Sequence, residues 1–311
     1  MSVRQEPGVA AASIVRRRPP RVSIGLPVFN GERYLEATLA AVLGQDFADF
    51  ELLISDNAST DRTRDISEEF AARDRRVSYH RNSENIGAAR NYNQVARMAL
   101  AEFFRWQTYD DLVEPTHLGR CMRVFDEGAS DVVLVYPQTL LIDGRGQVIE
   151  PYDDRTEVTD PRPDRRLAHL LRHLHLCNAV LGVARMEALR KTRLIGPYRG
   201  SDVVLLAELA MLGTIIEIPE RLFMRRRSHE LPSPANLSPD AQARWYDTRR
   251  KGDRLPLTTL FWQHLVSSAR LPIPLADRAR CGWTVFREWG PRHWRSIGGE
   301  LKLELKSLLR A

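Results

Sequence analysis

The chain has 311 residues, 43% of them hydrophobic and 28% charged, which is typical of a globular protein with room for one large α/β domain or two smaller ones. Its three cysteines form no CxxC pair, which disfavours a disulfide framework or a structural zinc site and fits a reducing cytoplasm. The net charge of +6 lies at the two ends, because residues 1–22 carry +4 and residues 241–311 carry +8, and the acidic body between them argues against a nucleic-acid-binding core.

The N-terminal segment MSVRQEPGVAAASIVRRRPPR places most of its arginines after a short apolar stretch. This order is the reverse of a secretory signal, in which the positive charges come first. We therefore expect residues 1–20 to form a disordered basic leader. No run approaches the roughly 18 apolar residues of a transmembrane helix, so we expect no membrane span.

Strands and helices are expected to alternate in the first third of the chain. Apolar, β-branched runs predict strands, whereas apolar residues at helical spacing between capping and breaking residues predict helices. The strands are expected at 21–29, 50–56, 76–81 and 102–108, and the helices at 31–45, 59–74 and 87–101. Such alternation indicates βαβ units and a mostly parallel, Rossmann-like sheet flanked by helices.

The pattern changes after residue 115. We expect helices at 115–127, 166–175, 186–192 and 201–213, and a strand at 178–184. The segments 131–143 and 214–229 each predict two short strands, the former broken at Pro137, and the segment 144–165 predicts a surface loop. A loop at 230–240 suggests a boundary between a domain at 21–235 and a helical C-terminal annex at 236–311.

Polar residues follow the predicted strands at the point where each strand ends. Asn30 follows the first strand, Asp56 and Asn57 follow the second, and Asp110 and Asp111 follow the fourth. Ligands of open α/β sheets bind outside the carboxyl ends of the strands, so these side chains should converge on one crevice.

The crevice lacks the usual phosphate-binding motifs, because neither GxGxxG nor GxxxxGK[ST] follows the first strand. Asp56 could accept hydrogen bonds from a base or a ribose. The adjacent carboxylates of Asp110 and Asp111 are hard oxygen ligands that suit Mg²⁺ or Mn²⁺ bridging phosphates. Such an ion would neutralise the charge on a departing diphosphate.

Several segments, taken together, resemble a family 2 glycosyltransferase of the inverting, GT-A type. VSIGLPVFNGERYLEATLAAVLGQDFADFELLISDNASTDRTRDI is similar to the opening of that family, and NSENIGAARNYNQV and WQTYDDLVEP follow in its order and spacing. The resemblance covers residues 21 to about 125 closely and continues more loosely to about 230. It implies a GT-A-like fold, a nucleotide-diphosphate sugar donor, usually a UDP- or dTDP-sugar, and a divalent cation.

The resemblance also implies roles for individual residues. Asp111 would be the direct metal ligand, whereas Asp110 would bind either the ribose or the metal, because Tyr109 stands where the commonest form of the motif has Asp. Asp202, in GPYRGSDVVLLAELAMLG, would be the base that deprotonates the acceptor hydroxyl, and His229 would lie near the diphosphate and the metal. The residues expected at the nucleotide sugar are Pro27, Phe29, Asn30, Asp56, Asn57 and Arg90.

Purely structural roles are the alternatives for these residues. The aspartates at 110, 111 and 202 could cap helices, and Asp56 with Asn57 could form an Asx-turn. Arg90 and His229 could simply be exposed to solvent.

The basic tail holds five of the six tryptophans. It suits either an amphipathic element on anionic lipid at the inner face of the membrane or a helical annex on the catalytic domain that could also serve as a dimer contact. Taken together, these features predict a cytoplasmic hexosyltransferase of polysaccharide or cell-envelope biosynthesis. Its acceptor is expected to be a hydroxyl group, and no nucleic-acid partner is expected. The competing readings are a sugar-phosphate nucleotidyltransferase and a scaffold that only binds the nucleotide sugar.

Overall fold

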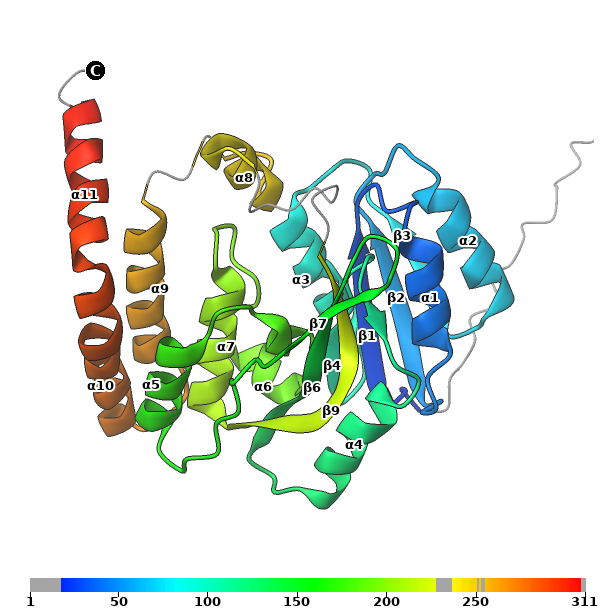
Figure 1. Cartoon of the computed structure of the whole chain (residues 1–311), viewed down its shortest axis with the longest axis horizontal. Helices are drawn as coiled ribbons and strands as arrows, with labels where there is room; N and C mark the ends of the chain where they lie inside the picture. Colours follow the sequence, from blue (N-terminus) through cyan, green and yellow to red (C-terminus); the bar gives the residue numbers. More distant parts are fainter. Residues whose placement is uncertain (1–17, 228–236, 251, 253–254, 309–311) are drawn as a thin grey trace, which may run out of the picture.

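The computed structural model describes residues 18–227, 237–250, 252 and 255–308 (Figure 1). Within them lies a nine-stranded sheet with the order β3-β2-β1-β4-β8-β6-β9-β5, to which β7 adds by pairing with β6. The strands are β1 Val22–Val28, β2 Phe50–Asp56, β3 Val77–Arg81, β4 Phe103–Trp106, β5 Leu112–Val113, β6 Val132–Ile142, β7 Val148–Tyr152, β8 Val183–Arg185 and β9 Thr214–Arg226.

Helices follow or connect these strands. The helices of the sheet region are α1 Leu35–Leu43, α2 Thr63–Arg73, α3 Ala88–Met98, α4 His117–Glu127, α5 Pro163–His173, η1 Asn178–Leu181, α6 Met186–Lys191 and α7 Ser201–Leu212. Those of the C-terminal annex are α8 Pro239–Tyr246, α9 Pro256–Arg270, α10 Leu275–Thr284, η3 Val285–Trp289 and α11 Gly290–Leu308. No helix of the described residues is both long enough and apolar enough to cross a bilayer.

Strands β1 to β4 form the parallel half that the alternating pattern predicts. All residues of β1 and β2 are buried, which explains their continuous apolar runs, because helices cover both faces of a parallel sheet. Strands β4, β7 and β8 also pair antiparallel with their neighbours, so the complete sheet is mixed. The α/β fold with a helical annex is thus confirmed, while the parallel character belongs to the N-terminal half and to the β6–β9 pair.

A gap in the pairing opens between β1 and β4 at their carboxyl ends. The register of the two strands ends where Gly25 lies opposite Trp106, and the last bond joins the Gln107 N–H to the Gly25 carbonyl. Pro27 lies beyond this point, so its missing N–H removes no bond to β4. The chain order reverses here, with β2 and β3 on one side of β1 and β4 on the other, which is where ligands of such sheets bind.

Pro137 and Pro219 do not end the strands in which they lie. β6 and β9 are each continuous and pair in parallel along their length, against the expectation of four short strands. Pro137 lies opposite Ile218, whereas the next residue pairs with Arg221, so Pro219 and Glu220 form a bulge. A bulge accommodates a residue without an N–H and lets the strand continue.

Two further expectations of the second half were wrong in part. The segment expected to be only a loop contains β7, whose side chains are mostly exposed and therefore show no apolar pattern. The strand expected at 178–184 is a 3₁₀ turn, η1, followed by the short strand β8. Residues 1–17 of the expected leader lie outside the described residues, and Arg18 forms an ion pair with Asp49 at 3.1 Å.

The annex packs on the sheet region through a second apolar cluster. Helix α9 lies against α7, and α10 lies against α5, at the side of the molecule away from β2 and β3 (Figure 1). The cluster joins residues of both parts: Leu167, Ala207, Met211, Leu271, Cys281, Val285 and Trp289. The expected boundary near residue 235 falls in a segment outside the described residues, and the division into two domains stays a prediction.

A buried carboxylate ties α7 to α9. Glu208 is 1% exposed and accepts hydrogen bonds from the Arg193 Nε at 2.9 Å and the Ser267 hydroxyl at 2.8 Å. The same Arg193 donates to the backbone oxygen of Gln263 at 3.0 Å. The annex is therefore held by charged hydrogen bonds as well as by apolar packing.

We expect Glu208→Ala to lower the free energy of unfolding by about 2–3 kcal/mol, because it leaves Arg193 without its buried partner. Partial exposure of Arg193 keeps this below the value for a fully buried pair. Chemical denaturation would measure the change. The matched control is Glu187→Ala, which removes an exposed pair with Lys191 and should change stability by less than about 0.5 kcal/mol. Equal effects of the two substitutions would contradict the anchoring role.

Candidate active site

The loops after β1 and β2 hold each other through reciprocal hydrogen bonds. The Asn30 N–H donates to the Ser59 hydroxyl at 2.9 Å, and the Asn30 side-chain oxygen accepts from the Thr60 N–H at 2.9 Å. The Gly31 N–H donates to the Thr63 hydroxyl at 2.8 Å. Asn30 has a φ of 52°, a left-handed conformation that asparagine tolerates. The expected nucleotide residue Asn30 is therefore also the clamp between the two loops.

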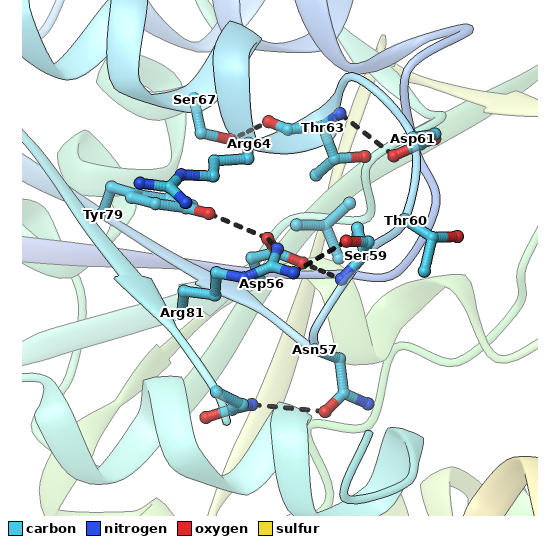
Figure 2. A network of polar contacts seen from close by, with 12 residues as sticks. Asp56, Asn57, Ser59, Thr60, Asp61, Thr63, Arg64, Ser67, Tyr79 and Arg81 are labelled. Atoms are coloured by element: carbon cyan, nitrogen blue, oxygen red, sulfur yellow. Dashed lines mark hydrogen bonds and ion pairs between the residues drawn. The ribbon is translucent and has the colours of Figure 1, made fainter. Parts of the chain in front are cut away.

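Asp56 ends β2 and is fully buried (Figure 2). Its carboxylate accepts from the Ser59 N–H at 2.8 Å, the Tyr79 hydroxyl at 2.8 Å and the Arg81 guanidinium at 2.5 Å. A carboxylate has about four acceptor positions, so three of them are used within the protein. The Arg81 side chain is about one-third exposed, so in the ion pair with Asp56 the arginine is the partner that contacts solvent.

Asn57 connects the end of β2 to the start of α3. Its side chain donates to the Asn85 oxygen at 2.8 Å and accepts from the Ile86 N–H at 2.9 Å. Asn82 donates to the same Asn57 oxygen at 3.2 Å. Asn57 is buried, so its contacts fix the loop at residues 82–87, which leads into α3.

Asp111 lies between β4 and β5, directly before β5, and its carboxylate accepts hydrogen bonds on both oxygens. One carboxylate oxygen accepts from the Thr108 hydroxyl at 2.5 Å, and the other accepts from the Arg226 N–H at 2.7 Å. The Asp111 carbonyl accepts from the Thr38 hydroxyl of α1 at 3.1 Å. Strand β9 and helix α1 thus position the carboxylate that the sequence singles out as a metal ligand.

Asp110 lies beside Asp111 with its backbone oxygen bonded to the Arg226 side chain at 2.8 Å. Burial, and next the charge of Asp111, raise the pKa of Asp110 to about 7. Burial likewise raises the pKa of Asp111. Two carboxylates forced together away from water are stabilised by a bound cation.

Asp202 lies in the first turn of α7, after Gly200 in the left-handed conformation. Its carboxylate accepts from the N–H of the next residue, Val203, at 3.0 Å. Burial raises the pKa of Asp202, and the hydrogen bond from the Val203 N–H lowers that pKa in part. The N-cap position belongs to Gly200, and Asp202 bonds to an N–H of the first turn, so it supports the start of the helix whatever its chemical role.

The three carboxylates lie around common neighbours. Burial, and then the charges of Asp110, Asp111 and Asp202, raise the pKa of the Tyr92 phenol. The guanidinium of Arg225 lowers the pKa of all three carboxyl groups. The segment between β4 and β5 and the start of α7 therefore lie within electrostatic range of the same groups, although about 90 residues separate them in the sequence.

The remaining expected residues differ in their placement. Phe29 is 41% exposed at the end of β1, where an aromatic ring is available to a ligand, whereas Pro27 is buried in the strand. Arg90 is exposed in the first turn of α3 and forms no ion pair with any residue that the structure describes. His229 lies outside the described residues.

The carboxylate pair fits a divalent cation. Among the described residues no group of three or more His, Cys, Asp or Glu side chains is arranged to hold a metal. Asp110 and Asp111 would then supply the protein ligands, and the remaining positions would be filled by phosphate oxygens and water, as is common for Mg²⁺. The raised pKa values of both groups are consistent with this fit.

Several residues of the site escape sequence reasoning. Arg81 and Tyr79 belong to β3, and their contact with Asp56 follows from strand pairing, in which Arg81 lies opposite Asp56. Arg226 reaches the aspartate pair from β9, and Asn178 bonds to the Arg225 side chain. A charged residue at the end of the neighbouring strand was the available signal for Arg81, whereas the contacts of Arg226 and Asn178 depend on pairing between distant segments.

The fold is that of a GT-A-type glycosyltransferase. Over 84% of the chain it resembles Staphylococcus aureus TarS residues 1–349 in complex with UDP-GlcNAc, with a TM-score of 0.60, 17% identity and 70% of that chain covered. It also resembles the mannosyltransferase PcManGT from Pyrobaculum calidifontis in complex with GDP-Man and Mn²⁺, with a TM-score of 0.50, 17% identity, and coverage of 91% and 85% of the two chains.

The chain belongs to glycosyl transferase family 2, whose family model matches residues 23–192. An uncharacterized glycosyltransferase of Rickettsia typhi is 27% identical over 124 residues, which cover 40% of this chain and 38% of that protein. Chondroitin synthase of Escherichia coli is 30% identical over 138 residues, 44% of this chain and 20% of that protein. The chain thus spans well under half the length of these two relatives.

Proposed function

We propose that the protein is an inverting, metal-dependent glycosyltransferase that moves a sugar from a nucleotide-diphosphate donor to an acceptor hydroxyl. The observation that carries the proposal is that the charges of Asp110, Asp111 and Asp202 act on Tyr92, and that the charge of Arg225 acts on all three carboxyl groups. Two carboxylates suit the diphosphate end of the donor, and the third suits proton removal from the acceptor.

In the proposed reaction, Asp202 accepts the proton of the acceptor hydroxyl as that oxygen attacks the anomeric carbon. A bond forms between the acceptor oxygen and the anomeric carbon, and the bond from that carbon to the β-phosphate oxygen breaks. The nucleoside diphosphate leaves with both electrons of the broken bond, and the configuration inverts. Burial of Asp202 raises its pKa and so makes it a stronger base than an exposed aspartate.

Asp111 and Asp110 would hold the divalent cation, Mn²⁺ or Mg²⁺. When bound, the ion supplies positive charge at the departing diphosphate. Arg225 adds a fixed positive charge near the same carboxylates, and Asn178 holds its side chain. Asp56 and Arg81 lie at the end of β2, where the base and ribose of the nucleotide would bind beside Phe29, Asn30, Asn57 and Arg90.

The donor is proposed to be a UDP- or dTDP-sugar. The UDP-GlcNAc complex of TarS supports UDP, whereas the GDP-Man complex of PcManGT keeps GDP in the test. The acceptor is proposed to be a hydroxyl of a glycan, a lipid-linked glycan or a small molecule in polysaccharide or cell-envelope biosynthesis. The name of chondroitin synthase favours a glycan, and the proposed location is the cytoplasm.

Calorimetric titration of UDP, dTDP and GDP, with and without Mn²⁺, tests the donor site. We expect UDP or dTDP to bind in the presence of Mn²⁺ and to bind much more weakly after EDTA treatment, because the paired carboxylates otherwise repel the diphosphate. Folded protein that binds none of the three would contradict the proposal. Binding without transfer to any acceptor would indicate a scaffold, and pyrophosphate release from a nucleoside triphosphate and a sugar 1-phosphate would indicate a nucleotidyltransferase.

A further inference from the structure

The outer side of the annex is unusually apolar for an exposed surface. Eight of the twelve large apolar side chains that are exposed in the described residues lie between 262 and 305. Trp283 is 66% exposed and Trp294 is 62% exposed, although tryptophan normally buries most of its surface. Figure 1 shows why this side is free: α11 is the outermost helix, and α9 lies between it and α7.

Positive charges accompany these apolar residues in a regular way. At four places from η3 to α11 an exposed apolar residue is followed directly by an exposed cation, whereas Leu303 is followed by Glu304. Neighbours on an α-helix differ by about 100° in direction. The cations therefore lie along one flank of the apolar residues. The pairs are Phe286–Arg287, Trp294–Arg295, Leu301–Lys302 and Leu305–Lys306, of which Arg287 also donates to Glu288 at 2.9 Å.

The acidic residues of the same helices are directed inward. Glu288 is buried and bonds to Arg172 of α5, and Glu300 accepts from the Leu257 N–H and the Thr258 N–H at the start of α9, at 3.0 Å each. Glu304 is partly buried and has an interaction partner. Glu288 and Glu300 thus bond to residues of α5 and α9 within the protein. The outer side of α11 presents mainly cations and apolar groups.

We propose that the outer face of η3 and α11, together with Trp283 of α10, docks in the plane of an anionic lipid surface. Tryptophan and leucine side chains would enter the boundary between headgroups and acyl chains, and the lysines and arginines would meet lipid phosphates. This geometry lies along the surface and requires no membrane-spanning helix.

Charge complementarity selects lipid over a second copy of the chain. A symmetric dimer through this face would bring the cations of both copies together with few acids to pair with them, because the acids are engaged inside. An anionic bilayer neutralises the same cations and accepts the apolar residues. The inference does not depend on the proposed catalysis, because binding is measured without turnover.

Co-flotation with vesicles tests the proposal, using phosphatidylcholine alone and phosphatidylcholine mixed with phosphatidylglycerol. We expect the full chain to float only with the anionic vesicles and to dissociate as salt rises. The double variant Lys302→Glu with Lys306→Glu should lower the partition coefficient by roughly 30-fold or more, from about fivefold per charge near the surface. Trp283→Ser with Trp294→Ser should lower it by more than about tenfold.

Matched controls change similar residues elsewhere on the surface. Val148→Ser with Ile149→Ser replaces exposed apolar residues of β7, and Arg123→Glu with Arg97→Glu reverses exposed charges on α4 and α3. Both should float like the unchanged chain, and circular dichroism should show all variants folded. Equal flotation of the annex variants and the unchanged chain would overturn the proposal. The proposal would also be overturned if the unchanged chain did not float with either kind of vesicle. In that case, a dimer that sedimentation detects in the unchanged chain and that the tryptophan variant loses would identify the face as a contact between two copies.

Discussion

Asp202→Asn should lower kcat by about 10²–10⁴-fold, the usual contribution of a general base, while nucleotide affinity stays unchanged. Asparagine keeps the shape of the side chain and can still accept from the Val203 N–H, but it cannot take the acceptor proton. Helix α7 should therefore stay intact, since its N-cap is Gly200. Steady-state transfer kinetics with a saturating donor would measure the change.

The pH profile of the unchanged enzyme provides a second readout of the same role. The base must be deprotonated to act, and burial raises the pKa of Asp202. The acid limb of kcat should therefore lie above the ordinary aspartate pKa of about 3.9, and the limb should be absent from the residual activity of Asp202→Asn. The control is Asp65→Asn, an exposed carboxylate in the first turn of α2. A kcat for Asp202→Asn within tenfold of the unchanged enzyme would exclude Asp202 as the base.

The first half of the fold was predictable because its signals are local. Strands β1, β2 and β4 are apolar runs buried on both faces, and each is followed by a polar residue at its carboxyl end. Parallel βαβ units bring those ends to one edge by topology alone. Asp56, Asp110 and Asp111 were therefore expected at one edge of the sheet; Asp56 ends β2, and the aspartate pair lies between β4 and β5.

The second half was less predictable because tertiary pairing overrides the local signals. Pro137 and Pro219 are strand breakers by propensity, yet they meet across one β-bulge, and both strands continue. Strand β7 is an exposed edge without apolar alternation, so its pairing with β6 leaves no trace in the sequence.

The partners of the site residues were beyond sequence reasoning for the same reason. Arg226 bonds to Asp111 across 115 positions of the chain, through backbone geometry that no motif reports. The sequence also assigned Asn30 only to the nucleotide, whereas the structure gives it a second role in joining two loops. Residues that hold a ligand and residues that hold the loop can be the same, and a motif does not separate the two roles.

Asp111→Asn should abolish Mn²⁺-dependent nucleotide binding and lower kcat/KM by roughly 10²–10³-fold, because charge stabilisation by a metal ion contributes several kcal/mol. Thr108 and the Arg226 N–H hold the Asp111 carboxylate in place, so its position is fixed before the ligand arrives. Asparagine preserves an acceptor for Arg226 but removes the negative charge. The fold should therefore survive while the cation is lost.

Asp110→Asn separates the two roles that the motif leaves open for Asp110. If Asp110 binds the metal, this variant should lose Mn²⁺-dependent binding as Asp111→Asn does; if it binds the ribose, Mn²⁺ dependence should persist with a weaker nucleotide affinity. Asp131→Asn, an exposed aspartate just before β6, is the control and should change neither quantity. Calorimetric titration of the nucleotide at several Mn²⁺ concentrations distinguishes these outcomes. Unchanged Mn²⁺ dependence in Asp111→Asn would show that the carboxylate held by Thr108 and Arg226 is structural, and the metal ligand would then have to be sought elsewhere.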